Sequence, residues 1–259
     1  MIGWLDSIFA PAPDAARVAF LRSHGFAHRG LHSAAGSQEN SLRAFAMAIA
    51  GGHGMECDVQ LSRDDVPFVF HDADLDRLTS EHGPIANRTA AQLDQVMLRR
   101  EVAPIPRLSA LLTLVAERTP LLIELKAPSR AGVVALCRAV ERDLAHYDGP
   151  VAVMSFNPQV GAWFASHAPS RVRGLVVTEE NARGIRGKTR RNLAFWWARP
   201  DFLAYDIRDL PSRFARRARK RGVPVLTWTV RTPPQRLCAE AEADAPIFEI
   251  PADGAGPDG

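Results

Sequence analysis

Short runs of β-branched and aromatic residues alternate with amphipathic stretches along most of this chain. The runs that predict strands cover residues 25–30, 54–59, 66–70, 121–126, 151–156, 172–177, 202–206, 223–230 and 247–250. Apolar residues at helical spacing predict helices over residues 42–49, 90–98, 108–117, 131–146, 158–166, 188–197, 211–221 and 234–243. This alternation is typical of α/β proteins with a parallel sheet.

The connection between the second and third runs is too short for parallel strands. Only residues 62–65 separate the two runs, whereas a parallel crossover needs a dozen residues or more. We therefore expect an antiparallel hairpin, which keeps His71 close to the strand that carries Glu56 and Asp58. Eight strands remain when the return strand is set aside, and eight β/α units close into a barrel. The predicted fold is a TIM (β/α)8 barrel with a β-hairpin extension after strand 2.

The chain has the length of one such barrel. Its 259 residues contain no internal repeat or linker, so we expect a single domain over residues 1–259, with a core at about 24–251. The tail at 252–259 is rich in Gly, Pro and Asp and is expected to be disordered. No signal peptide and no apolar window of about 20 residues is present, which predicts a cytoplasmic protein.

Composition excludes some classes of protein. The chain is 46% hydrophobic and 24% charged with a formal net charge of +3, as in ordinary soluble proteins, and this predicts no nucleic-acid partner. No obligate protein partner is evident either. Cys57, Cys137 and Cys238 lack the spacing of a metal site and are expected to pack as small apolar residues in a reducing compartment.

Two basic segments have more than one interpretation each. Residues 213–221 predict an outer barrel helix with a solvated basic face, or a face that attracts anionic lipid. Residues 183–197 combine basic residues with Phe195, Trp196 and Trp197, which suits core packing, a lid or an interfacial patch. We expect at most a weak contact with a membrane.

Histidines and carboxylates stand near the ends of the first strands. His28 ends the first strand, and His71 follows the hairpin. Glu56 and Asp58 are two residues apart, so they project from one face of their strand. Because barrel enzymes place their chemistry at the C-terminal ends of strands, Glu124 should join them there. Adjacent inward carboxylates repel each other unless a cation neutralises them, and three oxygen donors favour Mg²⁺ or Ca²⁺ over zinc. Two histidines beside such an ion suggest hydrolysis of an anionic substrate.

These residues belong to an ordered set of motifs. In chain order the motifs are His28-Arg29-Gly30, Glu39-Asn40, Glu56-x-Asp58, His71-Asp72, Ile105-Pro106-Arg107-Leu108, Glu124-x-Lys126, Ser155-Phe156 and Thr227-Trp228-Thr229-Val230. The chain resembles the glycerophosphodiester phosphodiesterase family, a group of TIM-barrel enzymes related to phosphatidylinositol-specific phospholipase C. The resemblance spans nearly the whole chain.

The resemblance implies a role for each motif residue. It implies one divalent cation, Mg²⁺ or Ca²⁺, on Glu56, Asp58 and Glu124, and an acid/base pair of His28 and His71. It further implies a catalytic and phosphate-binding Arg29, with substrate contacts or support from Lys126, Glu39 and Trp228. One departure stands near the C-terminus, where Phe248-Glu249-Ile250-Pro251 occupies the place of the family's Thr-Asp-x-Pro.

The implied reaction is metal-dependent hydrolysis of a small-molecule glycerophosphodiester to glycerol 3-phosphate and an alcohol. One histidine would remove a proton from the nucleophile while the other protonates the leaving alcohol. The attacking group would be the substrate's own glycerol hydroxyl, or water directly. Two alternatives remain open: a lysophospholipase D-like enzyme at membranes, and a non-catalytic phosphodiester-binding barrel.

Overall fold

A computed structural model describes residues 2–34, 36–127, 132–180 and 182–250. The predicted tail at 252–259 lies outside these residues. Strands and helices alternate along the chain as predicted, and the fold is a TIM (β/α)8 barrel with a hairpin after its second strand. The chain forms two compact units, which we call the first unit (residues 1–26 and 151–248) and the second unit (residues 27–150 and 249 onward). Strand β1 (Phe26–Ala27) lies at their boundary in the sequence.

The second unit contains the early strands. Its elements are α2 (Leu42–Ala50), β2 (Gly54–Leu61), β3 (Pro67–Val69), η2 (Ile85–Asn87), α3 (Ala90–Leu93), α4 (Leu108–Val115), β4 (Leu121–Leu125) and α5 (Val133–Leu144). β2 pairs with β4 in parallel and with β3 in antiparallel fashion. The hairpin predicted from the short connection is therefore confirmed.

Helix α2 forms where its capping residues predict it. The Ser41 hydroxyl accepts a hydrogen bond from the backbone N–H of Ala44, which satisfies one of the free donors of the first turn. The helix ends at Gly51, and Gly52 follows with a φ of 69°. A positive φ is readily adopted by glycine, so the Gly-Gly pair ends the helix just before β2.

The segment between β3 and α4 packs around a small core of its own. Buried apolar residues from the hairpin, the irregular stretch and α3 form it: Phe68, Phe70, Leu75, Leu78, Ile85, Ala90, Leu93, Val96, Leu98 and Ile105. The helix predicted over residues 90–98 is shorter, because α3 ends at Leu93. Val96 and Leu98 alternate into the core instead, and Leu98 forms a β-bridge with Thr79.

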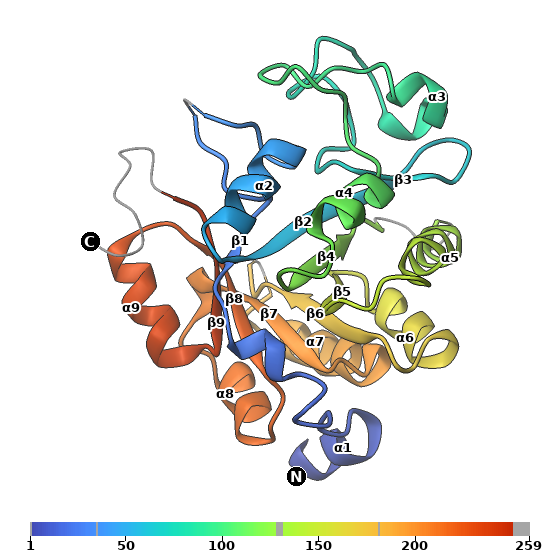
Figure 1. Cartoon of the computed structure of the whole chain (residues 1–259). Coiled ribbons are helices and arrows are strands. Elements are labelled where there is room, and N and C mark those ends of the chain that lie inside the picture. The colour runs from blue at the N-terminus through green and yellow to red at the C-terminus, as the bar shows by residue number, and fades with distance from the viewer. Residues whose placement is uncertain (1, 35, 128–131, 181, 251–259) are drawn as a thin grey trace. The chain divides into compact units, whose positions relative to one another are not determined.

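The first unit contains the later strands and their helices. Its elements are α1 (Ile2–Phe9), η1 (Ala19–Arg22), β5 (Val151–Ser155), α6 (Pro158–His167), β6 (Val172–Val177), α7 (Ile185–Ala198), β7 (Phe202–Asp206), η3 (Ile207–Asp209), α8 (Arg213–Lys220), β8 (Val225–Val230), α9 (Pro233–Glu242) and β9 (Ala245–Phe248). The strands from β5 to β9 are parallel neighbours in chain order. Helices α6 and α7 lie side by side (Figure 1).

The aromatic run on α7 divides between core and surface. Phe195 is fully buried, Trp196 is partly buried, and Trp197 remains about half exposed. The core interpretation therefore holds for Phe195 and not for Trp197. In the described ranges, no helix combines the length and apolarity needed to cross a membrane.

The cysteines are free thiols, as their spacing predicts. Cys57 and Cys137 are buried, and Cys238 is partly exposed. Cys57 lies between Glu56 and Asp58 on β2, and alternation along the strand turns its side chain to the opposite face.

We expect Gly30 to be the least replaceable of the positive-φ glycines. A Cβ at Gly30 would lie 2.8 Å from the Ala44 carbonyl carbon, whereas a Cβ at Gly52 meets nothing within 4 Å. Both residues have positive φ, so Gly52→Ala measures backbone strain alone, about 1 kcal/mol. Gly30→Ala should cost about 3 kcal/mol or more, since steric overlap adds to that strain. Urea unfolding of both variants tests this, and equal losses would contradict it.

Candidate active site

Three buried carboxylates converge in the second unit. Glu56 and Asp58 lie two residues apart on β2, and Asp58 stands opposite Glu124 in the register between β2 and β4. All three side chains are buried. One oxygen from each lies within 4.8 Å of the others, so the structure brings the three predicted metal ligands together.

Two cations face these three carboxylates. Lys126 Nζ lies 2.8 Å from Asp58 Oδ1 and 2.6 Å from Glu124 Oε1, and Arg29 Nε lies 3.1 Å from Asp58 Oδ2. Although burial opposes ionisation of Asp58, the charges of Lys126 and Arg29 hold its pKa well below its usual range. The opposite holds for Glu56, whose pKa is raised well above the usual value by burial and then by the charges of Asp58 and Glu124. Among the described residues, three carboxylates thus meet two paired cations in this cluster.

The donor set fits a hard divalent cation. Glu56 Oε1 is buried and has no hydrogen-bond partner within the described residues, while Glu56 Oε2 accepts a hydrogen bond from the backbone N–H of Arg29 at 3.1 Å. A buried carboxylate oxygen without a donor is costly unless a cation meets it. Three carboxylates supply oxygen ligands alone, which suits Mg²⁺ or Ca²⁺.

The backbone around Arg29 adopts the left-handed region. Arg29 and Asn40 have φ values of 55° and 59°, and the N–H of Asn40 donates to the Arg29 carbonyl at 2.9 Å. The side chain of Asn40 donates to Asp58 Oδ2 at 3.0 Å. Non-glycine residues with positive φ are uncommon and gather at functional sites. Asn40 stood in the sequence motif, but its role as a support of Asp58 became visible only in the structure.

Glu39 lies between two arginines. Arg29 donates to Glu39 Oε1 at 2.6 Å, and Arg77 donates to both of its oxygens at 2.8 Å. Despite burial, hydrogen bonds from Arg77 and the charge of Arg29 lower the pKa of Glu39 to about 2. The same Arg77 also donates to both oxygens of Asp72. Neither Arg77 nor Asp72 was assigned a role from the sequence, because an exposed arginine five residues after a carboxylate carries no distinctive signal.

His71 is held through its backbone and through one ring nitrogen. The Gln60 amide donates to the carbonyls of Phe70, His71 and Asp72, which fixes this segment against β2. His71 Nδ1 lies 2.7 Å from Asp72 Oδ1. The contact at Nδ1 leaves Nε2 on the other side of the ring from Asp72, and 32% of the side chain is exposed. Burial lowers the pKa of His71, although Asp58 and Asp72 oppose this.

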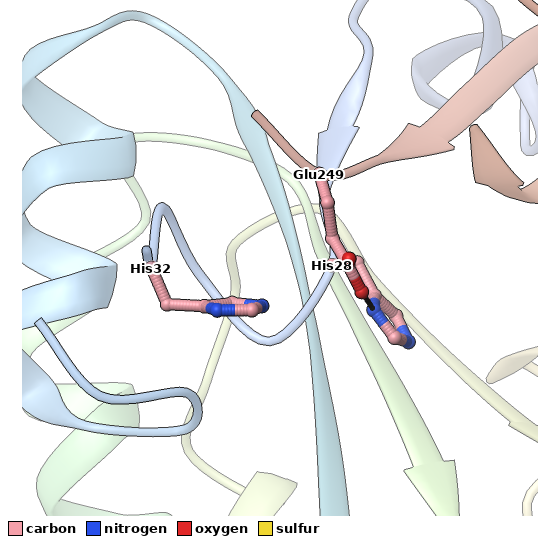
Figure 2. A group of neighbouring side chains, drawn as sticks. All are labelled: His28, His32 and Glu249. Carbon is pink, nitrogen blue, oxygen red and sulfur yellow. Dashed lines mark hydrogen bonds and ion pairs between the residues drawn. The ribbon is translucent and has the colours of Figure 1, made fainter. Parts of the chain in front are cut away.

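His28 has a matching arrangement. Its Nδ1 lies 2.7 Å from Glu249 Oε1 (Figure 2). Its Nε2 lies 3.9 Å from Glu56 Oε2. Burial lowers the pKa of His28, and the hydrogen bond to Glu249 opposes this shift. Glu249 comes directly after β9, which ends two residues earlier than predicted. The departure from the family pattern at this strand therefore still supplies a carboxylate to His28.

His32 lies beside the same pair. One ligand atom from each of His28, His32 and Glu249 falls within 4.8 Å of the others, and Figure 2 shows the His32 ring directed toward the other two side chains. His32 Nε2 is buried without a hydrogen-bond partner in the described part of the chain. Nδ1 of His28 is already in contact with Glu249. We therefore interpret the three residues as a support for the His28 ring.

Trp228 belongs to β8 of the first unit. Its Nε1 donates to the Ala204 carbonyl at 2.9 Å, and its ring packs edge-on against Phe156 at 5.5 Å. These contacts fix the indole, and its part in substrate binding stays a prediction.

The chain is similar to curated proteins over about half of its length. An uncharacterized protein of Mycobacterium tuberculosis is 31% identical over 157 residues, which are 54% of this chain and 50% of that protein. The chain thus matches about half the length of such curated relatives.

Solved structures share the fold. A phosphodiesterase of Oleispira antarctica, solved in complex with the product sn-glycerol-3-phosphate, is 24% identical with a TM-score of 0.76, covering 88% of this chain and 93% of that chain. A glycerophosphodiester phosphodiesterase of Thermotoga maritima is 25% identical with a TM-score of 0.70, covering 86% and 92%. The family model of the glycerophosphoryl diester phosphodiesterase family matches residues 28–254, which is most of the chain. This protein, with its buried carboxylate cluster and its two carboxylate-bound histidines, belongs to that family.

Proposed function

We propose that this protein hydrolyses glycerophosphodiesters to glycerol 3-phosphate and an alcohol, using one divalent cation and two histidines. The observation that carries the proposal is the pairing of each histidine with a carboxylate at Nδ1, at 2.7 Å in both cases, in the unit that holds the three-carboxylate cluster. The glycerol 3-phosphate bound to the Oleispira antarctica relative is consistent with this substrate class.

Glu56, Asp58 and Glu124 would hold the cation, either Mg²⁺ or Ca²⁺. When bound, such an ion offsets charge on the phosphate oxygens and supplies Lewis acidity. Arg29 and Lys126 flank the same carboxylates and would bind the non-bridging oxygens of the phosphate, where their charges stabilise the transition state.

His28 and His71 would transfer the protons. Burial lowers the pKa of both rings, and their carboxylate partners oppose this shift. One ring would enter the step neutral and accept a proton from the nucleophile at Nε2, while the other would enter as imidazolium and give its Nε2 proton to the leaving alcohol. The carboxylates of Glu249 and Asp72 stabilise the imidazolium that forms and hold each ring with Nε2 free. The proton taken by one histidine is matched by the proton that the other gives to the leaving alcohol.

Glu39 would support the site without touching the reacting atoms. It fixes Arg29 from one side and Arg77 from the other, and Arg77 in turn holds the carboxylate of Asp72. Through this chain of ion pairs, the phosphate-binding arginine and the support of His71 share one structural frame.

A substrate panel tests the proposed reaction. We expect turnover of glycerophosphocholine and similar diesters with release of glycerol 3-phosphate, loss of turnover in excess EDTA, and recovery with Mg²⁺ or Ca²⁺. A lysophospholipid assayed beside them distinguishes the membrane-substrate alternative. Full turnover in EDTA by protein free of metal, or no turnover of any diester with metal present, would refute the proposal.

Replacement of either histidine tests the acid/base pair. His28→Ala and His71→Ala should each lower turnover by about 10²–10⁴, the usual worth of a positioned general acid or base. His82→Ala is a matched control, because His82 makes a similar contact with Asp76 at 2.8 Å but lies on the surface. Near wild-type turnover of a folded His28 or His71 variant would remove that residue from the mechanism.

A further inference from the structure

The first unit contains a cavity of about 540 Å³ lined by basic side chains. Five cationic residues and one serine line it: Ser7, Arg213, Arg216, Arg217, Lys220 and Arg221. None of these residues belongs to the proposed catalytic set. The proposed reaction therefore leaves this concentration of positive charge unexplained.

Helix α8 presents its charges on one face. Arg213, Arg216, Arg217 and Lys220 recur at the three- and four-residue spacing that places side chains together on a helix. The opposite side, formed by Phe214, Ala215 and Ala218, is buried in the core. The prediction of an outer helix with a basic face is confirmed, and the cavity shows that this face is hollowed.

Part of this charge has no acidic partner. Arg216 pairs with Glu242 at 2.6 Å, while Arg217 and Arg221 lie 2.9 Å and 3.6 Å from the buried Asp6. Within the ranges that the structure describes, Arg213 and Lys220 form no ion pair, and both are exposed. The surface thus keeps two free cations for an external anion.

Helix α1, which contributes Ser7 to the cavity lining, carries two exposed apolar side chains. Trp4 lies three residues before Ser7 and Ile8 one residue after it, so Trp4 and Ile8 are at i, i+4 spacing and are neighbours on the helix. Each of these two side chains is 60% exposed. Asp6 accepts a hydrogen bond from Trp196 Nε1 at 2.8 Å, and this bond ties α1 to α7. The helix that carries the exposed Trp4 and Ile8 is therefore held against α7, and its Asp6 also pairs with Arg217 and Arg221 of the basic lining.

We propose that these residues form a membrane-docking surface for anionic phospholipids, made of Trp4, Ile8 and the basic lining of the cavity. Exposed arginine and lysine attract acidic headgroups, and a tryptophan with an aliphatic neighbour enters the interfacial region. Electrostatic attraction or apolar insertion alone rarely gives stable membrane binding, but the two contributions add when one surface provides both. The sequence suggested only weak contact, because it did not show that α1 and α8 share a cavity.

Vesicle sedimentation tests the docking surface. Wild-type protein should sediment with phosphatidylcholine vesicles containing about 30% phosphatidylglycerol, not with phosphatidylcholine alone, and salt should weaken this binding. Arg213→Glu with Lys220→Glu should weaken it by about tenfold or more, with unchanged turnover of a soluble diester. Trp4→Ala with Ile8→Ala should also weaken it. Unfolding midpoints equal to wild type confirm that these variants fold.

A matched variant distinguishes binding at this surface from a general effect of net charge. Arg43→Glu with Arg138→Glu replaces exposed arginines on α2 and α5 and changes the net charge by the same amount, so it should keep vesicle binding. Three results would overturn the proposal: no binding to anionic vesicles, an equal loss in the matched variant, or binding to single-stranded RNA without binding to vesicles.

Discussion

The second unit depends on an imbalance of buried charge. Glu56, Asp58 and Glu124 are buried together, and two cations, Lys126 and Arg29, form ion pairs with Asp58 and Glu124. Burying a carboxylate without a neutralising cation costs free energy. Glu56 bears this cost: its pKa is raised, and its Oε1 has no hydrogen-bond donor among the described residues. A divalent cation would remove the imbalance, and the same ion would then meet the phosphate of a substrate.

Each histidine depends on a carboxylate that comes from a different part of the chain. Asp72 follows His71 directly, whereas Glu249 is 221 residues from His28 in the sequence. Both contacts are made at Nδ1, so the two rings are held in the same way. Arg77 and Glu39 extend this frame to Arg29, so replacement of a support residue should affect proton transfer and phosphate binding together.

The features that could be predicted from the sequence are those that hydrophobic periodicity and residue spacing determine. The alternation of strands and helices, the short connection before Val66 and the i, i+2 spacing of Glu56 and Asp58 were enough for the fold class, the hairpin and the carboxylate cluster. Supports that depend on tertiary contact were not predictable. Arg77 reaches Glu39 through an irregular segment with its own small core, and α1 lies outside the family pattern. The early end of β9, which makes Glu249 available to His28, depends on register that local propensity does not set.

Metal binding measured by isothermal titration calorimetry tests the central claim most directly. Chelator-treated protein should bind one Mg²⁺ or Ca²⁺, and Glu56→Gln should weaken binding strongly while the fold persists, because an isosteric neutral amide removes the charge that calls for the ion. Glu117→Gln, at a glutamate after α4 and outside the cluster, should leave binding unchanged. Absence of binding by the wild-type protein, or equal binding by Glu56→Gln, would contradict the account.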